Sequence, residues 1–323
     1  MLVPRFWAEH KEKFTHKKKR YTVRRFGWSN ESFEKAKEHA IMRVKEARAD
    51  LVSGNEVARR EFKVPYNGAD GVPIREEIVE THNDVVITRN SYGALCLNTA
   101  DVLFADIDFE LHKAATRWHV LSLTLLETAV VLGSFYYHSL WMLLLFTLMA
   151  FALTPVLAHV ISHIVSWNPQ HHAMTRIRAF VATHPDWRLR VYRTPAGLRI
   201  LAMHRTFSTE DPQVNELFTK LGCDPQYIRM CHHQRCFRAR LTPKPWRVNI
   251  KHHIVPRRGV WPVDPVWIPA REAWIREYEN ACRFYAACHF LDELGEDRID
   301  RKVETIRKLH DDICRATSDF PLA

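Results

Sequence analysis

Apolar residues are concentrated in one long stretch of this 323-residue chain. From Trp118 to Trp167 the sequence is almost continuously apolar, and Glu127 is its one formally charged residue. About 20 apolar residues cross the hydrocarbon core of a bilayer, whereas one helix of about fifty residues would be about 75 Å long. The pattern therefore predicts two transmembrane helices, over 118–137 and 140–165, with a break within 133–139.

Basic residues flank this stretch on both sides. Lys113 and Arg117 precede it, and Arg176 and Arg178 follow it. The positive-inside tendency then puts both outer ends of the hairpin on the cytoplasmic side. We expect a protein of the inner (plasma) membrane with two spans and both termini in the cytoplasm. Its expected partners are the lipid bilayer and, through the hairpin, a second copy of the chain.

Three ionisable residues interrupt the expected spans, namely Glu127, His159 and His163. An ionisable group inside a membrane suggests a functional site, which here would be a proton relay from Glu127 to the histidines. Two helices enclose no pathway, however, and both histidines fall near the inner interface. The pattern favours shielding of Glu127 by the partner helix or by a second copy.

Outside this stretch, strand-like and helix-like patterns alternate, which is typical of an α+β protein. Strands are expected over 6–12, 21–26, 85–89, 94–97, 102–109, 188–193, 198–204 and 237–241. Helices are expected over 31–52, 74–80, 174–183, 212–221, 269–294 and 301–317. The chain then divides into an N-terminal part (1–117), the transmembrane hairpin (118–167), the rest of the α/β domain (168–268) and a C-terminal helical pair (269–323).

The distribution of charge and of cysteines limits the partners and the protein classes that the chain fits. The net charge is +10, and much of the excess lies in a basic run between Lys11 and Arg25. Such a run attracts anionic lipid or nucleic-acid phosphate, or is simply a solvated hairpin. The seven cysteines lack the spacing of a disulfide framework, which argues against a disulfide-rich secreted domain. Cys231 and Cys236, with two histidines between them, suggest zinc weakly, because no second ligand pair follows beyond His252 and His253.

The strongest chemical signal is the pair Asp106 and Asp108. Alternate residues of a strand share a face, so both carboxylates would stand together opposite an apolar face. Carboxylates held about 7 Å apart repel one another unless a cation lies between them. Mg²⁺ or Mn²⁺ is the expected cofactor, and such ions serve phosphoryl transfer. An exposed strand end explains the same tripeptide without any chemistry.

Basic residues later in the chain complete a candidate phosphate site. The turn from Thr194 to Gly197 lets the backbone approach a phosphate, and Arg193 and Arg199 flank it. Two further arginines alternate along one strand and a lysine follows that strand, so their cationic groups suit phosphate. These three residues are Arg238, Arg240 and Lys244.

The order of these motifs resembles the archaeo-eukaryotic primase (primase-polymerase) superfamily. The resemblance implies an RRM-like core with a membrane hairpin inserted, Asp106 and Asp108 as catalytic metal ligands, and Thr194 and Gly197 at the nucleotide phosphates. Arg199 stands where that family has histidine, and Asp264 is the candidate for its third acidic residue. The chain is also similar to uncharacterised bacterial membrane proteins that share the Tyr-Gly-Ala, Asp-Ile-Asp and Tyr-Arg-Thr-Pro-Ala-Gly blocks.

Three hypotheses for function follow. The first is a membrane-anchored, metal-dependent nucleotidyltransferase acting on nucleotides or nucleic acid. The second is a catalytically inactive membrane protein that binds nucleotide or nucleic acid, suggested by Arg199 and by the lack of a clear third acid. The third is a membrane-anchored interaction scaffold that recruits partners through its C-terminal helices, although Trp274, Tyr278 and Cys282 recur there at a spacing typical of a core face.

Overall fold

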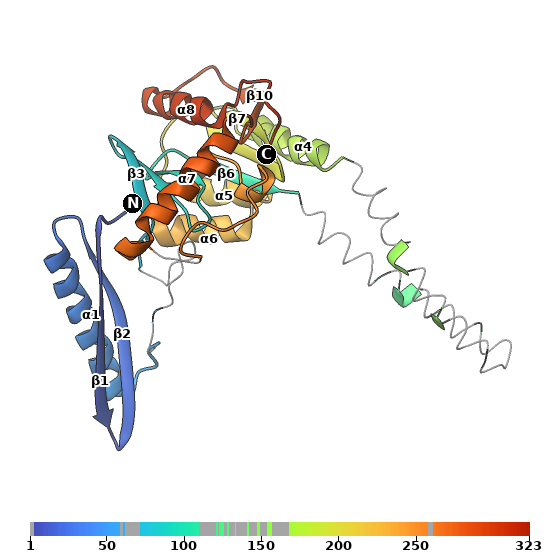
Figure 1. Ribbon diagram of the computed structural model, residues 1–323. Helices are drawn as coiled ribbons and strands as arrows, with labels where there is room; N and C mark the ends of the chain where they lie inside the picture. Colours follow the sequence, from blue (N-terminus) through green and yellow to red (C-terminus); the bar gives the residue numbers. More distant parts are fainter. Residues whose placement is uncertain are drawn as a thin grey trace. The chain divides into compact units, whose positions relative to one another are not determined.

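The computed structural model describes residues 3–58, 61, 72–109, 168–257 and 261–323, together with scattered positions between 121 and 156. It confirms an α+β protein (Figure 1). The chain forms two compact units. One comprises residues 1–107, 180–195 and 199–323, and the other comprises 108–179 and 196–198.

The first sheet is the antiparallel hairpin of β1 (Phe6–His16) and β2 (Lys19–Ser29). Helix α1 (Phe33–Ser53) begins at the capping side chain of Ser32 and packs along the hairpin (Figure 1). Gly27 permits this close approach, because a Cβ there would lie 2.1 Å from the carbonyl oxygen of Ala36. The hairpin and the helix predicted from the sequence are confirmed.

The second sheet has the order β3–β4–β5–β9 and is antiparallel throughout. Its strands are β3 (Glu77–His82), β4 (Val85–Arg89), β5 (Leu95–Thr99) and β9 (Phe237–Arg240). The helix predicted over 74–80 is therefore wrong. Asn83, with φ of 53°, makes a tight turn that folds β3 back onto β4, and this pairing decides the conformation of the segment.

The third sheet has the order β10–β7–β8–β6. Its strands are β6 (Phe104–Asp108), β7 (Arg188–Thr194), β8 (Gly197–Ala202) and β10 (His289–Gly295). Strand β10 falls inside the helix predicted over 269–294, which instead ends early as α7 (Ile268–Cys282). Antiparallel pairing with β7 overrides the helical propensity of this segment.

Helices cover these sheets. Helix α8 (Arg301–Cys314) contributes Val303, Ile306 and Cys314 to a core shared with both four-stranded sheets. Helix α5 (Pro212–Leu221) buries Val214, Leu217, Phe218 and Leu221, the spacing of an amphipathic helix. Helix α4 (Pro169–Thr183) follows the predicted membrane segment.

Helix α6 (Pro225–Gln234) was not predicted. Asp224 caps it and Pro225 occupies its first turn, a start signal that the sequence does contain. Tyr227 on this helix joins the two four-stranded sheets, because its hydroxyl donates to the carbonyl of Phe104 and accepts from the amide of Arg238.

Most of the predicted transmembrane hairpin, including Glu127, His159 and His163, lies outside the described residues. Lys113, Arg117 and the turn predicted at 66–71 also lie outside them. Within the part of the chain that is described, no helix combines the length and the apolar character needed to cross a membrane. The scattered positions described between 121 and 156 are helical.

Candidate functional site

Asp106, the first residue of the acidic pair, forms an ion pair with Arg199. Nε of Arg199 donates to Oδ1 at 2.9 Å, and Nη2 donates to Oδ2 at 3.3 Å. The Arg199 side chain is 2% exposed and that of Asp106 is 29% exposed. Burial lowers the pKa of Arg199, but the Asp106 charge outweighs it and raises the pKa above its ordinary value. A guanidinium, rather than a divalent cation, balances the charge of Asp106.

This pairing bears directly on the expected Mg²⁺ or Mn²⁺ site. Both carboxylate oxygens of Asp106 accept hydrogen bonds from Arg199, and a cation beside Arg199 would be repelled by its fixed charge. A divalent metal at Asp106 would therefore have to displace this ion pair. Asp108, at the end of β6, is exposed.

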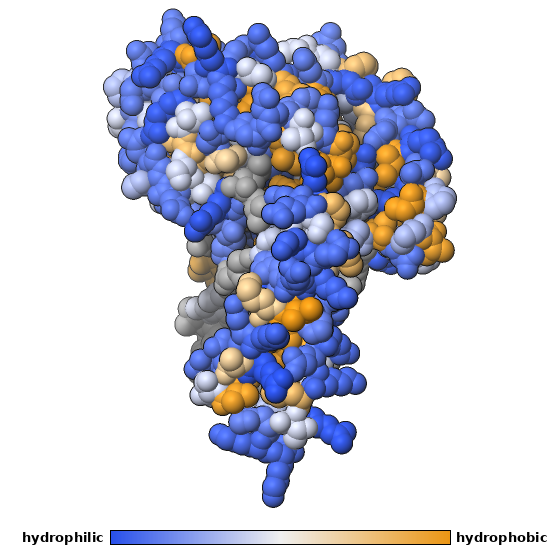
Figure 2. Space-filling model, turned by 90° about the vertical axis from the view of Figure 1, so that its left-hand side faces the viewer, coloured by the Kyte–Doolittle hydropathy of each residue, from blue (hydrophilic) through white to orange (hydrophobic). Residues whose placement is uncertain are grey.

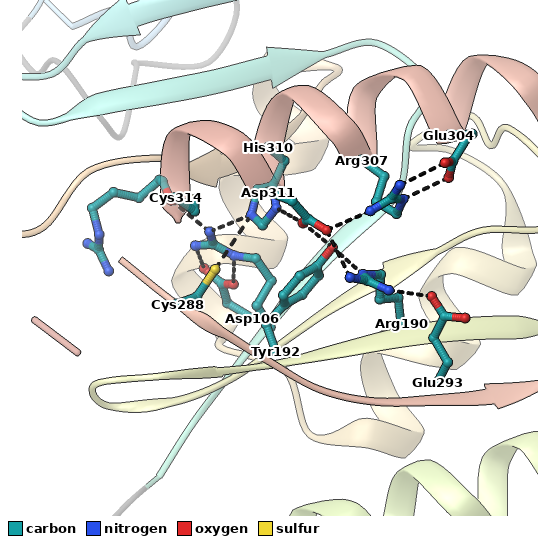
Figure 3. Close-up of polar contacts among 12 residues, drawn as sticks. Asp106, Arg190, Tyr192, Cys288, Glu293, Glu304, Arg307, His310, Asp311 and Cys314 are labelled. Carbon is teal, nitrogen blue, oxygen red and sulfur yellow. Dashed lines mark hydrogen bonds and ion pairs between the residues drawn. The ribbon is translucent and has the colours of Figure 1, made fainter. Parts of the chain in front are cut away.

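A buried polar network continues from Arg199 (Figure 3). Its Nη1 donates to the carbonyl of Arg240 at 2.7 Å and lies 3.4 Å from Nε2 of His310. The other ring nitrogen of His310, Nδ1, lies 3.0 Å from Asp311. The carboxylate of Asp311 also accepts hydrogen bonds from three further groups on β7 and α8. These donors are Arg190, Tyr192 and Arg307.

Two buried cysteines adjoin His310 in this network. Nε2 of His310 lies 4.0 Å from Sγ of Cys288. The ligand atoms of Cys288, His310 and Cys314 all lie within 4.8 Å of one another. A hydrogen bond from Cys314 holds the pKa of Cys288 well below its ordinary value, whereas burial raises the pKa of Cys314. Over the described ranges, this is the one group of three His, Cys, Asp or Glu side chains able to hold a metal ion.

The zinc site suggested at Cys231 and Cys236 is not such a group. Cys231 lies in α6 and Cys236 immediately before β9, and both are buried. Burial raises the pKa of Cys236 to about 12. Among the described residues, no third His, Cys, Asp or Glu ligand atom lies close enough to Cys231 and Cys236 to complete a metal site. The histidine between them that is most exposed, His233, faces solvent. Both cysteines therefore contribute to packing.

Arg238 lies in the second sheet and not beside Asp106. Its Nη2 donates to both carboxylate oxygens of Glu76, at 2.9 and 2.6 Å, and both side chains are buried. Glu76 also accepts from the hydroxyl of Thr88 at 2.6 Å. Arg238 and Glu76 thus form an internal ion pair, and the arginine does not present its guanidinium to a phosphate.

The other predicted phosphate ligands are more accessible. Arg240 is half-buried and donates to the hydroxyl of Tyr92 at 3.2 Å. The ring of Tyr92 lies 5.5 Å from that of Trp246, which is 57% exposed. Nζ of Lys244 lies 5.4 Å from the same tryptophan ring. Two cations and two aromatic rings therefore share one partly exposed patch, a combination suited to stacking a base.

The predicted turn at Thr194 to Gly197 is confirmed as the connection between β7 and β8. Arg193 and Thr194 at its start are half-buried, and burial lowers the pKa of Arg193. Asp264 caps a short 3₁₀ helix, where its carboxylate accepts from the amide of Val266. This structural role accounts for Asp264 without a metal.

Most of the basic run lies on one face and at the tip of the β1–β2 hairpin. Eight basic and two acidic residues lie between Phe6 and Ser29, a net charge of +6 of the chain's +10. The register places Lys11 opposite Arg24, and Thr15 opposite Arg20, on the face away from α1. Lys17 and Lys18 form the turn, and Lys19 pairs with His16 at the end of the strands. We call the following set of cations on this face and at the tip the basic face: Lys11, Lys13, Lys17, Lys18, Lys19, Arg20 and Arg24. All except Arg24 are exposed.

Figure 2 shows the hydropathy of this region. The lower end of the view, which corresponds to the hairpin tip of Figure 1, is predominantly hydrophilic. The opposite face of the hairpin meets α1 through Phe14, Val23 and Val44. Glu9, the acid on the basic face, lies 3.7 Å from Arg24.

Sequence reasoning found the basic run but missed the cysteine and histidine cluster. His310 and Cys314 are four residues apart on the buried face of α8, and their spacing on a helix was a usable signal. Cys288 lies far from them in the sequence, in a segment that was predicted to be helical. Only the pairing of β10 with β7 brings that segment to α8.

Comparison of the chain with family models, with curated proteins and with solved structures gave no match. The resemblance to the primase superfamily therefore stays a prediction that rests on the quoted motifs. The site has to be interpreted from its own geometry.

Proposed function

We propose that this chain is a membrane-anchored protein that binds nucleic acid through the basic face of its β1–β2 hairpin. The observation that carries the proposal is the concentration of exposed cations on one face and at the tip of a two-stranded ribbon. Phosphate contacts from Lys and Arg supply most of the affinity of sequence-independent nucleic-acid binding. A two-stranded ribbon also has dimensions that the major groove of DNA admits.

Nucleic acid is favoured over a lipid surface by the composition of the basic face. Elements that bind membranes at the interface combine cations with an apolar face that enters the lipid. The exposed residues at the hairpin tip, from Lys17 to Arg20, are all basic. Polybasic lipid-binding clusters are typically juxtamembrane. Nearly a hundred residues (21–117) separate this tip from Trp118, the first residue of the predicted spans.

The backbone at the hairpin tip supports a functional role for its lysines. Lys17 and Lys18 have φ of 46° and 63°, in the left-handed region where Asn and Gly are preferred. A side chain there costs about 1 to 2 kcal/mol per residue. Lysine at both positions lowers the stability of the turn but adds two positive charges. Strained residues of this kind cluster at binding sites.

Membrane anchoring is supported by the apolar stretch and by its described positions. Leu125, Trp141 and Leu148 are 64%, 83% and 64% exposed. Exposed apolar side chains at these positions agree with the apolar sequence that surrounds them, which is long enough for two spans. We infer that residues 118–167 form the anchor and that the basic face belongs to the cytoplasmic part.

The proposal is tested with the full chain in nanodiscs of phosphatidylcholine. Binding of a fluorescent random-sequence DNA duplex is measured for the wild type, for Lys11→Glu with Lys13→Glu, and for Lys37→Glu with Lys45→Glu. The control pair is exposed on α1 and changes the net charge equally. We expect the hairpin variant to bind at least about tenfold more weakly and the control to stay within about twofold.

Equal weakening by the two variants would show a response to net charge alone and would refute the assignment to the basic face. In a parallel experiment, binding of the same proteins to vesicles with and without phosphatidylserine is measured. Binding to phosphatidylserine that depends on Lys11 and Lys13, with no binding to DNA, would replace nucleic acid by lipid. Absence of DNA binding by the wild type would also end the proposal.

Nucleotidyl transfer on an RRM-like, primase-type core is the second candidate. It is favoured by strand β6, which carries Asp106 and Asp108 at alternate positions, and by the β7–β8 turn at the expected place. Manganese-dependent incorporation of nucleotides is compared between the wild type and Asp106→Ala. Incorporation that Asp106→Ala abolishes while it keeps the circular-dichroism spectrum of the folded wild type would support this candidate, and equal signals from both proteins would exclude it.

A further inference from the structure

Cys288, His310 and Cys314 form a buried cluster that nucleic-acid binding does not require. We propose that these three side chains bind a Zn²⁺ ion. Thiolate sulfur and imidazole nitrogen are the ligands that zinc prefers in proteins. All three residues come from elements of the third sheet and its covering helix, because Cys288 immediately precedes β10, and α8 contributes the other two.

The spacing of the ligand atoms suits a tetrahedral ion. Zinc lies about 2.3 Å from sulfur and about 2.0 Å from nitrogen, so tetrahedral ligands are about 3.5 to 3.8 Å apart. Sγ of Cys288 and Nε2 of His310 lie 4.0 Å apart, and no two ligand atoms of the cluster are more than 4.8 Å apart. A contraction of well under 1 Å per ligand brings all three to binding distance.

The surroundings of His310 fix the ring in the orientation that a metal ligand needs. Nδ1 lies 3.0 Å from Oδ1 of Asp311, and a carboxylate can only accept, so Nδ1 carries a proton. Nε2 then carries the lone pair, and it lies 4.0 Å from Sγ of Cys288 and 3.4 Å from Nη1 of Arg199, so a bound ion would replace the contact with Arg199. Histidine ligands of metals are usually held by such a carboxylate. Asp311 is itself fixed by Tyr192 and Arg190, as Figure 3 shows.

The charges around the cluster balance when zinc is bound. Two thiolates neutralise the ion, and the adjacent Arg199 is neutralised by Asp106. Cys288, His310 and Cys314 are buried and supply three ligand atoms, so a single water molecule would complete the four ligands that zinc takes. A buried divalent ion is tolerated only with such compensation. The site therefore suits a structural ion that joins β10 to α8.

The plain alternative is that three buried side chains pack as ordinary core residues. Free cysteine often behaves as a small apolar residue. The two interpretations differ in one measurable way, because a core cluster binds no metal whereas a zinc site binds it with defined stoichiometry. Cys236 offers a matched control, since it is equally buried and lies in the same unit, outside the cluster.

The test uses the full chain, purified in detergent, stripped with a chelator and titrated with Co²⁺ and then Zn²⁺. We expect about one Co²⁺ per chain, with the intense visible bands of a tetrahedral thiolate site, and displacement by Zn²⁺. Cys236→Ser should keep the spectrum and Cys314→Ser should lose it. Asp311→Asn retains all three ligands and should weaken Zn²⁺ binding about 10- to 100-fold.

The wild-type titration decides the proposal even if Cys314→Ser fails to fold. A wild-type protein that gives no tetrahedral cobalt spectrum and retains no zinc would overturn it. A spectrum that Cys236→Ser removes and Cys314→Ser preserves would also overturn it, because the ion would then be bound elsewhere.

Discussion

At the scale of single residues, Arg199 and Arg238 are buried in internal ion pairs and do not form part of an exposed phosphate site. Each is nearly inaccessible to solvent, and each has a carboxylate as its partner, Asp106 for Arg199 and Glu76 for Arg238. The alternation of polar and apolar residues gave the face of a strand on which each arginine lies. It could not give the nearest acid, because Asp106 and Glu76 reach these arginines only through strand pairing across long separations in the sequence.

Removing one partner of the buried ion pair should be costly. We expect Arg238→Met to lower the free energy of unfolding by about 3 to 5 kcal/mol, because it leaves Glu76 buried and uncompensated. Adding Glu76→Leu should recover most of this loss. Urea unfolding of both variants checks the prediction. A double variant as unstable as the single one would show that Arg238 acts through something other than Glu76.

Glu293 should make stability depend on pH. Burial raises the pKa of Glu293, but hydrogen bonds from Arg190 and Arg188 outweigh it and hold the pKa below its ordinary value. The stabilisation is therefore present above the unfolded-state pKa of about 4.3 and is lost as the pH falls through the lower folded pKa. Glu293→Gln should cost about 1 to 2 kcal/mol at pH 7.

This cost of Glu293→Gln should shrink as the medium becomes more acidic than about pH 4. Urea unfolding of the wild type and the variant at a series of pH values measures the difference. A difference that stays constant down to the acid limit would contradict the role given to this carboxylate.

At the scale of elements, local turn and cap signals predicted the positions of helices, strands and turns better than composition did. The β1–β2 hairpin, α1, α5 and the turn between β7 and β8 follow from such signals, and the structure confirms them. Strand β10 and helix α6 did not follow. The segment of β10 is rich in helix formers and is a strand only because β7 lies beside it. The start of α6 was marked by Asp224 and Pro225, but no element was assigned to this segment.

Replacing the two lysines of the hairpin turn should stabilise the hairpin and weaken its binding to DNA. Lys17→Asn with Lys18→Gly supplies the residues that this two-residue turn prefers. We expect the hairpin to become about 1 to 3 kcal/mol more stable, so its amides should exchange hydrogen at least about fivefold more slowly. DNA affinity should fall, because two cations are lost. An unchanged rate of amide hydrogen exchange would contradict the claim that these lysines strain the turn. Tighter binding to DNA would contradict their contribution to binding.

At the scale of the whole molecule, the sequence predicted where charge and apolar residues accumulate. The basic run and the apolar stretch can be recognised from the order of residues alone. The zinc cluster needed the tertiary fold, because Cys288 and Cys314 belong to different elements. The proposed acidic metal site illustrates the opposite case. A correct strand and a correct pair of aspartates were found, but Arg199 on the adjacent strand balances the charge of Asp106.

The salt dependence of DNA binding tests the central claim most directly. Each phosphate contact contributes about 0.9 to the slope of log K against log salt concentration. The account predicts a steep negative slope for the full chain, and a slope shallower by about 2 for Lys11→Glu with Lys13→Glu. Lys37→Glu with Lys45→Glu should leave the slope of the wild type unchanged. Identical slopes for the wild type and the hairpin variant would contradict binding through the basic face.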